Sequence, residues 1–84
     1  MAALPSLRQL GYLVELADRL NFRVAAEAQF VTQSTLSAGI KELENQLGVQ
    51  LVERTKRSVR LSAVGEDVVA RARELLAAAT DLAE

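Results

Sequence analysis

The 84-residue chain contains no cysteine and no histidine. Disulfides, thiol chemistry and zinc fingers are therefore excluded, together with the side chain that most often serves as a metal ligand or general base. No uninterrupted apolar run approaches the ~20 residues that a membrane span needs, and the N-terminus lacks the pattern of a signal peptide. With one proline and four glycines, the composition predicts one small helical domain in the cytoplasm, without a metal or cofactor.

Charge is unevenly distributed along the chain. The net charge is −1, which alone argues mildly against a nucleic-acid partner. Four cations nevertheless fall within seven residues, at Arg54, Lys56, Arg57 and Arg60, and no carboxylate occurs from residue 54 to residue 65. This cluster is either a solvated turn or a surface for an anionic partner.

Apolar residues at helical spacing predict two helices near the N-terminus. The first is capped by Ser6 and runs to Asn21, and the second is short, covering residues 23–29 with Asn21 as its cap. Phe22 and Phe30 are expected to supply apolar contacts at the two ends of the second helix. The alanines of this helix allow close packing against its neighbours.

A third helix, predicted from Thr32 to Gly48, has two unlike faces. At about 100° per residue, one face carries large apolar side chains, namely those of Leu36, Ile40, Leu43 and Leu47. The opposite face opens with small polar residues such as Ser34, whereas an ordinary solvated helix face carries long Lys and Glu side chains. Such a face suits close approach either to another helix or to base edges in the major groove of DNA. The short second helix followed by this one is typical of a helix-turn-helix.

The second half of the chain predicts a hairpin and a long helix. Two β-prone segments, residues 51–54 and 58–61, flank a polar turn and would lift the basic cluster beside the third helix. A final helix of about 20 residues is expected to start from a cap at Ser62. Its apolar stripe predicts a homodimer contact, with packing on the first helix as the alternative. The stripe consists of Val68, Ala72, Leu75, Ala79 and Leu82.

These features together resemble the DNA-binding domain of the LysR-type transcriptional regulators of bacteria. The carriers of the resemblance are Phe22 with Ala25 and Ala26, Thr32-Gln33 with Leu36-Ser37, Leu43-Glu44 with Leu47-Gly48, Arg54, and Ser62 with Gly65. The resemblance implies a mainly α fold, with a winged helix-turn-helix over residues 1–62 and a linker and dimerisation helix over residues 63–84. The effector-binding domain of the family, and with it any small-molecule ligand, would be absent from this chain. The sequence ERTKRSV is similar to the peroxide-sensing OxyR branch, which implies control of oxidative-stress genes.

Resemblance and helical angle together predict the residues that contact double-stranded DNA. Those expected at or near base edges are Thr32, Gln33, Ser34, Thr35, Ser37 and Ala38. Those expected at phosphates or in the minor groove are Arg23, Lys41, Arg54, Thr55, Lys56 and Arg57. The family often has proline where this chain has Ser34, so the first turn of the third helix is less rigid here.

Two other functions compete with DNA binding. For an enzyme, the nearest carboxylate pairs, such as Glu42 with Glu44, do not share a helix face, and no catalytic partner accompanies them. We therefore expect no catalytic residues. A helical module that binds only other proteins is the stronger alternative, and binding to duplex DNA that weakens steeply with salt would distinguish the two.

Overall fold

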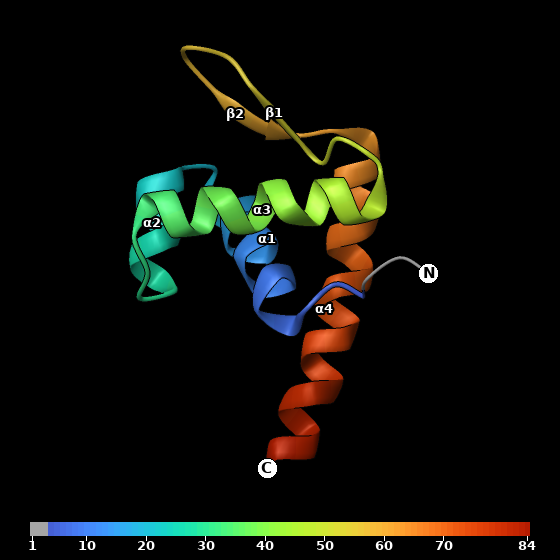
Figure 1. The fold of residues 1–84 in the computed structure, drawn as a ribbon. Helices are drawn as coiled ribbons and strands as arrows, with labels where there is room; N and C mark the ends of the chain where they lie inside the picture. Colours follow the sequence, from blue (N-terminus) through green and yellow to red (C-terminus); the bar gives the residue numbers. More distant parts are fainter. Residues whose placement is uncertain (1–3) are drawn as a thin grey trace.

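The structure, a computed structural model, describes residues 4–84, so the predicted domain over residues 1–62 is described from residue 4 onward. Within this range, helices and a hairpin follow one another along the chain (Figure 1). Their order is α1 (Leu7–Arg19), α2 (Phe22–Ala28), α3 (Gln33–Leu47), β1 (Val52–Arg54), β2 (Val59–Leu61) and α4 (Ala63–Ala83). β1 and β2 pair antiparallel, with Glu53 opposite Arg60. The predicted set of three helices, a hairpin and a long final helix is confirmed.

Each helix begins at a residue whose side chain accepts a hydrogen bond from a backbone N–H of the first turn. Ser6 forms a capping box with Gln9, in which Ser6 Oγ accepts from Gln9 N at 3.0 Å and Gln9 Oε1 accepts from Ser6 N at 2.9 Å. Asn21, Thr32 and Ser62 cap α2, α3 and α4 in the same way. All four predicted caps are confirmed. Each bond satisfies an N–H group that a helix end leaves unpaired.

Two predictions about α1 and α2 are wrong at the helix ends. α1 stops at Arg19, because Leu20 takes a left-handed conformation with φ of 52°. Phe30 was expected to pack at the end of α2, yet its side chain is 95% exposed. Its φ of 58° turns the chain sharply between α2 and α3, and Val31 packs against the core instead.

The core lies where α1, α2, α3, the start of the hairpin and the first half of α4 meet. Leu13 and Leu16 of α1, Leu36 and Leu43 of α3, and Leu51 before β1 are fully buried. Leu47 was predicted on the same buried face of α3, but it is exposed because it lies at the last residue of the helix, beyond that core.

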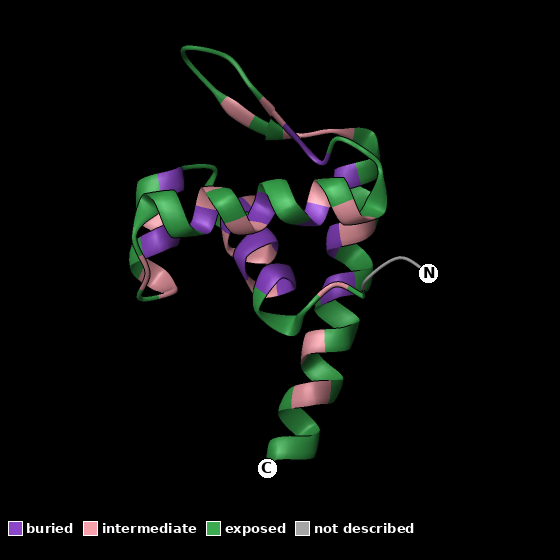
Figure 2. Ribbon diagram, viewed as in Figure 1, coloured by how far each residue is buried: buried purple, intermediate pink, exposed green. Residues whose placement is uncertain are grey.

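Helix α4 packs along α1 through its first half and then continues past the rest of the molecule (Figures 1 and 2). Its first turn is joined to the chain that enters the hairpin. Ser62 N donates to Leu51 O at 2.9 Å, and Ser62 Oγ donates to Gln50 O at 2.6 Å. Gly65 lies against the carbonyl of Leu51, where a Cβ atom would collide with the backbone. The close approach of α4 to the base of the hairpin therefore requires glycine at position 65.

Candidate nucleic-acid interface

The N-terminal half of α3 presents the predicted small polar front to solvent. Gln33, Ser34, Thr35 and Ala38 are exposed, while Leu36 on the other face is fully buried. Thr32 differs from these residues, because its hydroxyl accepts from Thr35 N at 3.1 Å and donates to Thr35 Oγ1 at 2.8 Å. The hydroxyl of Thr32 is thus used within the helix cap, and Thr35, which accepts from it, keeps its own hydroxyl hydrogen to donate to a ligand.

Small residues on α3 serve a second purpose that the sequence did not reveal. Gly39 faces α1, where the ring of Tyr12 is almost fully buried, and a Cβ at Gly39 would lie 2.7 Å from Tyr12 Cδ2. Such a distance is too short for two carbon atoms in contact. Glycine at this position therefore allows α3 to lie close to α1 while its polar front faces outward.

The hairpin turn holds its shape through Thr55. Its Oγ1 accepts from Arg57 N at 3.2 Å and from Ser58 N at 3.0 Å, and its backbone N–H donates to Ser58 O at 2.9 Å. These bonds explain how a turn without glycine forms. Thr55 was predicted to contact the DNA backbone, and the structure places its hydroxyl within the turn. Lys56 and Arg57 are exposed at the tip.

Glu44 fixes the hairpin to α3, a role that sequence reasoning missed. Its Oε2 accepts from Leu51 N at 2.9 Å and from Val52 N at 3.2 Å. Both donors are backbone groups of nearly or fully buried residues at the start of the hairpin. No local sequence signal marks this contact, because the partners lie seven and eight residues away across a turn.

Arg54 joins the hairpin to the polar front of α3. Its Nη2 donates to Ser37 Oγ at 2.9 Å, and its guanidinium carbon lies 4.2 Å from the ring centroid of Phe22. A predicted backbone contact and a predicted base contact are therefore parts of one hydrogen-bonded unit. Ser37 is half-buried, in contrast to the exposed Ser34.

Ion pairs separate the ten cations of the chain into two groups. Five are paired with carboxylates at 2.6–3.5 Å, as Arg19–Glu15, Arg23–Glu27, Arg60–Glu53, Arg71–Asp67 and Arg73–Asp18. Within residues 4–84, the cations without a carboxylate partner are Arg8, Lys41, Arg54, Lys56 and Arg57. Four of these five belong to the predicted DNA surface on α3 and the hairpin. Arg23, also predicted there, is neutralised by its neighbour on α2.

The predicted dimer stripe on α4 divides into buried and exposed parts. Ala72 is only 1% exposed and packs within its own chain, so it does not lie on the free surface. Leu75 and Leu82 are 53% and 89% exposed, and Val68 and Ala79 are half-buried, less exposed than these leucines but more exposed than Ala72. The buried side of α4 therefore packs on α1, which was the alternative to a dimer contact. The exposed part of the stripe remains an uncovered apolar strip.

A salt bridge fixes α4 to α1. Arg73 Nη2 donates to Asp18 Oδ1 at 2.6 Å. This hydrogen bond is the main reason why the pKa of Asp18 lies below its usual value, and it raises the pKa of Arg73. The pair joins residues 55 positions apart in the sequence.

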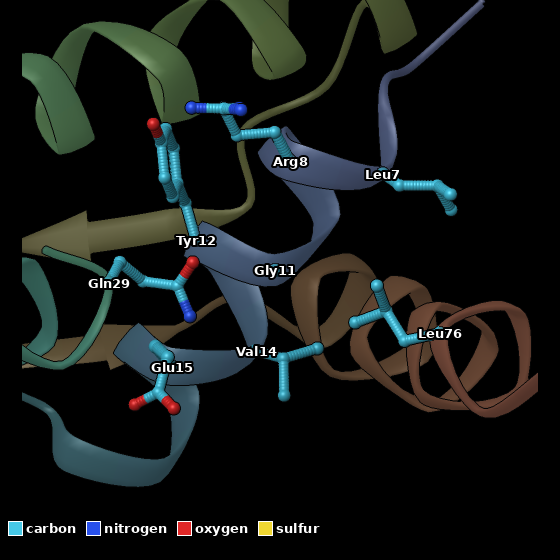
Figure 3. A pocket seen from close by; sticks show the side chains of 8 residues that line it. All are labelled: Leu7, Arg8, Gly11, Tyr12, Val14, Glu15, Gln29 and Leu76. Atoms are coloured by element: carbon cyan, nitrogen blue, oxygen red, sulfur yellow. The ribbon is translucent and has the colours of Figure 1, made fainter. Parts of the chain in front are cut away.

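An open hollow of about 580 Å³ lies between α1, the end of α2 and α4 (Figure 3). Val14 and Leu76 face one another on one side of it, and Gln29 lies on the other. Its single lining carboxylate, Glu15, is paired with Arg19 at 3.2 Å. The hollow thus offers no acid and base pair.

In the part of the chain described, no three acidic, His or Cys side chains gather as a metal site, and no helix has the length and apolarity to cross a membrane.

The geometry defines a class of protein. A short helix, a sharp turn and a second helix with a small polar front, followed by a cationic hairpin, form a winged helix-turn-helix, a fold in which the second helix enters the DNA major groove. Residues 7–66 match the model of the bacterial regulatory helix-turn-helix proteins of the lysR family. The chain belongs to this family, as the resemblance predicted, and the family is one of regulatory proteins, not of enzymes.

Similar proteins carry the same domain. The chain is 66% identical over 82 residues to the HTH-type transcriptional regulator EstR of Acinetobacter baylyi, covering 98% of this chain and 27% of that protein. It is 46% identical over 71 residues to the DNA-binding transcriptional dual regulator OxyR of Escherichia coli, covering 84% and 23%. The chain therefore spans about a quarter of the length of these relatives. The crystal structure of the BenM DBD with benA site 1 DNA matches it with a TM-score of 0.87 at 33% identity, covering 93% and 88%.

Proposed function

We propose that this chain binds double-stranded DNA in a sequence-specific manner, with the N-terminal half of α3 in the major groove and the hairpin on the backbone. The observation that supports this proposal is the separate location of cations with and without carboxylate partners. Carboxylates pair with half of the cations, and within residues 4–84 four of the five cations left without such partners lie on α3 and the hairpin, beside an exposed helix front of small polar side chains. The fit to a DNA complex of a homologous domain supports this placement.

Each part of the surface has a distinct role in this proposal. Gln33, Ser34, Thr35 and Ala38 would meet base edges, because small polar side chains let the helix approach the groove closely. The cations would contact phosphates, which position a protein without specifying sequence, and these are Lys41, Arg54, Lys56 and Arg57. Arg23 would have to exchange its ion pair with Glu27 for a phosphate. Thr32 and Thr55 would shape the surface through their internal hydrogen bonds.

The exposed strip of α4 supports a homodimer. Leu47 of α3 and Val68 and Leu75 of α4 line an apolar groove of about 360 Å³, and Leu82 continues the exposed strip toward the C-terminus. We propose that α4 of a second copy covers this strip, so that residues 63–84 act as the dimerisation helix and residues 1–62 as the DNA-binding domain. Two linked domains would then bind two half-sites. Once the first domain is bound, the effective concentration of the second domain at its half-site is raised.

The relatives suggest what the whole regulator controls. Those named OxyR favour oxidative-stress genes, the finer prediction of the sequence, whereas the higher identity to EstR favours a different target. Selection of bound duplexes from random DNA would identify the operator and its half-site spacing. A regulator of chromosomal genes would work in the cytoplasm.

Titration of the selected duplex and of a random duplex tests the proposal. Gln33→Ala should cost about 1–3 kcal/mol on the selected duplex and much less on random DNA, because an amide paired with one base edge discriminates against the others. Equal losses on both duplexes would remove Gln33 from the base contacts. If the parent chain binds neither duplex in a salt-dependent way, the protein-binding alternative replaces DNA binding.

Arg54→Ala tests the backbone contact against a matched control. It should weaken binding to both duplexes and reduce the slope of log affinity against log salt by roughly one contact. Arg60→Ala removes the same charge from the same hairpin, but Arg60 is already paired with Glu53 at 2.9 Å. The control should therefore leave the salt slope unchanged. Equal slopes for the two variants would contradict the role of Arg54.

A further inference from the structure

We propose that Phe22 is a positioning residue for DNA recognition, whose ring holds the guanidinium of Arg54 beside Ser37 before DNA arrives. The inference rests on the proposed function and assigns a DNA-binding role to a residue of the hydrophobic core. Phe22 is 7% exposed, so it does not reach DNA itself.

Three elements meet at this contact. Phe22 is the first residue of α2, Ser37 lies in α3 and Arg54 ends β1. The guanidinium carbon is 4.2 Å from the ring centroid, well inside the ~6 Å range of a cation–π contact, and Arg54 Nη2 is 2.9 Å from Ser37 Oγ. The ring and the hydroxyl together hold the Arg54 head group in place and direct its Nη2 toward α3.

The chemistry of the ring explains why this anchor suits an anion-binding surface. Arg23 and Arg60 are held by carboxylates, which cancel their charge. A benzene ring attracts a guanidinium through its quadrupole and leaves the positive charge in place. Of the five guanidinium N–H groups, one donates to Ser37, and the others remain for phosphate or base acceptors.

The same contact orients the hydroxyl group of Ser37. Its oxygen accepts from Arg54, so its own hydrogen is free to donate to an acceptor on DNA. Holding both side chains in place before binding lowers the conformational entropy that association removes. The Phe22 ring thereby contributes to affinity through two residues that it positions.

The test measures affinity for the selected duplex in a cycle of variants. Phe22→Leu keeps an apolar side chain but removes the ring, and it should weaken binding roughly two- to five-fold, the factor that corresponds to an exposed cation–π contact. Phe22→Tyr keeps the ring and should bind within about two-fold of the parent. In an Arg54→Ala background, Phe22→Leu should cause no further loss, because its effect acts through Arg54.

If Phe22→Leu further weakens binding to the selected duplex in the Arg54→Ala background, the proposal is overturned, since the ring would then act only through packing. A second measurement needs neither DNA nor the leucine variant. In the free parent chain, the ring current of Phe22 should shift the side-chain NMR signals of Arg54 upfield relative to those of Arg57, and unshifted signals would also overturn it. A parent chain that does not bind duplex DNA defeats the proposed function, whereas a binding parent matched by Phe22→Leu defeats this inference alone.

Discussion

Removing the carboxylate of Glu44 should detach the hairpin from α3 and destabilise the whole domain. Its Oε2 accepts two backbone hydrogen bonds, from Leu51 N and Val52 N, at the buried start of the hairpin. Glu44→Ala leaves both donors without their acceptor. Glu44→Gln keeps an oxygen at the same place but removes its charge.

The expected magnitude follows from these two bonds. A hydrogen bond to a charged group contributes about 1.5–3 kcal/mol. Glu44 is only half-buried, so water can partly replace its carboxylate as the acceptor. We therefore take the lower limit of this range for each bond. Glu44→Ala should then reduce the free energy of unfolding by about 3 kcal/mol, and Glu44→Gln by roughly 1 kcal/mol. For a domain of this size, 3 kcal/mol corresponds to a fall in Tm of roughly 12–24 °C.

Thermal and urea unfolding followed by circular dichroism would measure these differences. Glu42→Ala is the matched control, because Glu42 lies on the same helix but is exposed, and within residues 4–84 its side chain accepts one hydrogen bond, from Gln46 at 3.5 Å. That variant should stay within about 0.5 kcal/mol of the parent. Amide exchange at Leu51 and Val52 should accelerate in Glu44→Ala. If Glu44→Ala unfolds like Glu42→Ala, the two bonds do not hold the hairpin.

Two further predictions concern α4. Because Arg73 lowers the pKa of Asp18, this pair stabilises the fold above the unfolded carboxyl pKa, and the contribution disappears as pH falls through the lowered folded value. The Tm of the parent should thus exceed that of Asp18→Asn at pH 7, and the difference should shrink as pH falls below ~4 and vanish once pH is below the lowered pKa of Asp18; a constant difference would contradict the assignment. Replacing Leu75 and Leu82 together by Glu should dissociate dimers in sedimentation and weaken binding to paired half-sites while sparing a single half-site. A double variant that sediments and binds like the parent would show that this strip does not form the interface.

The sequence predicted the fold well wherever a structure depends on neighbouring residues. The caps at Ser6, Asn21, Thr32 and Ser62 are side-chain hydrogen bonds to N–H groups three residues away, so local sequence is sufficient to place them. Phe30 shows the limit. Whether an aromatic residue after a short helix packs or points outward depends on the handedness of one backbone position, and hydrophobicity carries no information about that.

The candidate surface was predicted in outline but not in its connections. Helical angles place Gln33 and Ser34 opposite the buried Leu36, as the structure does. The unit that joins Phe22, Ser37 and Arg54 spans three elements, and only the folded chain brings these residues together. Likewise, counting charges predicted four cations in the hairpin segment, whereas the pairing of Arg60 with Glu53 depends on strand register.

The junction at Ser62 and Gly65 couples the start of α4 to the hairpin. Leu51 bonds to the first turn of this helix and also to Glu44, so a rotation of α4 cannot occur without displacing the hairpin or breaking those bonds. With 21 residues, α4 is about 30 Å long, and the buried Val69 and Ala72 together with the Arg73–Asp18 salt bridge hold its first half on α1. A displacement of the start of α4 would therefore also displace the hairpin that carries Lys56 and Arg57.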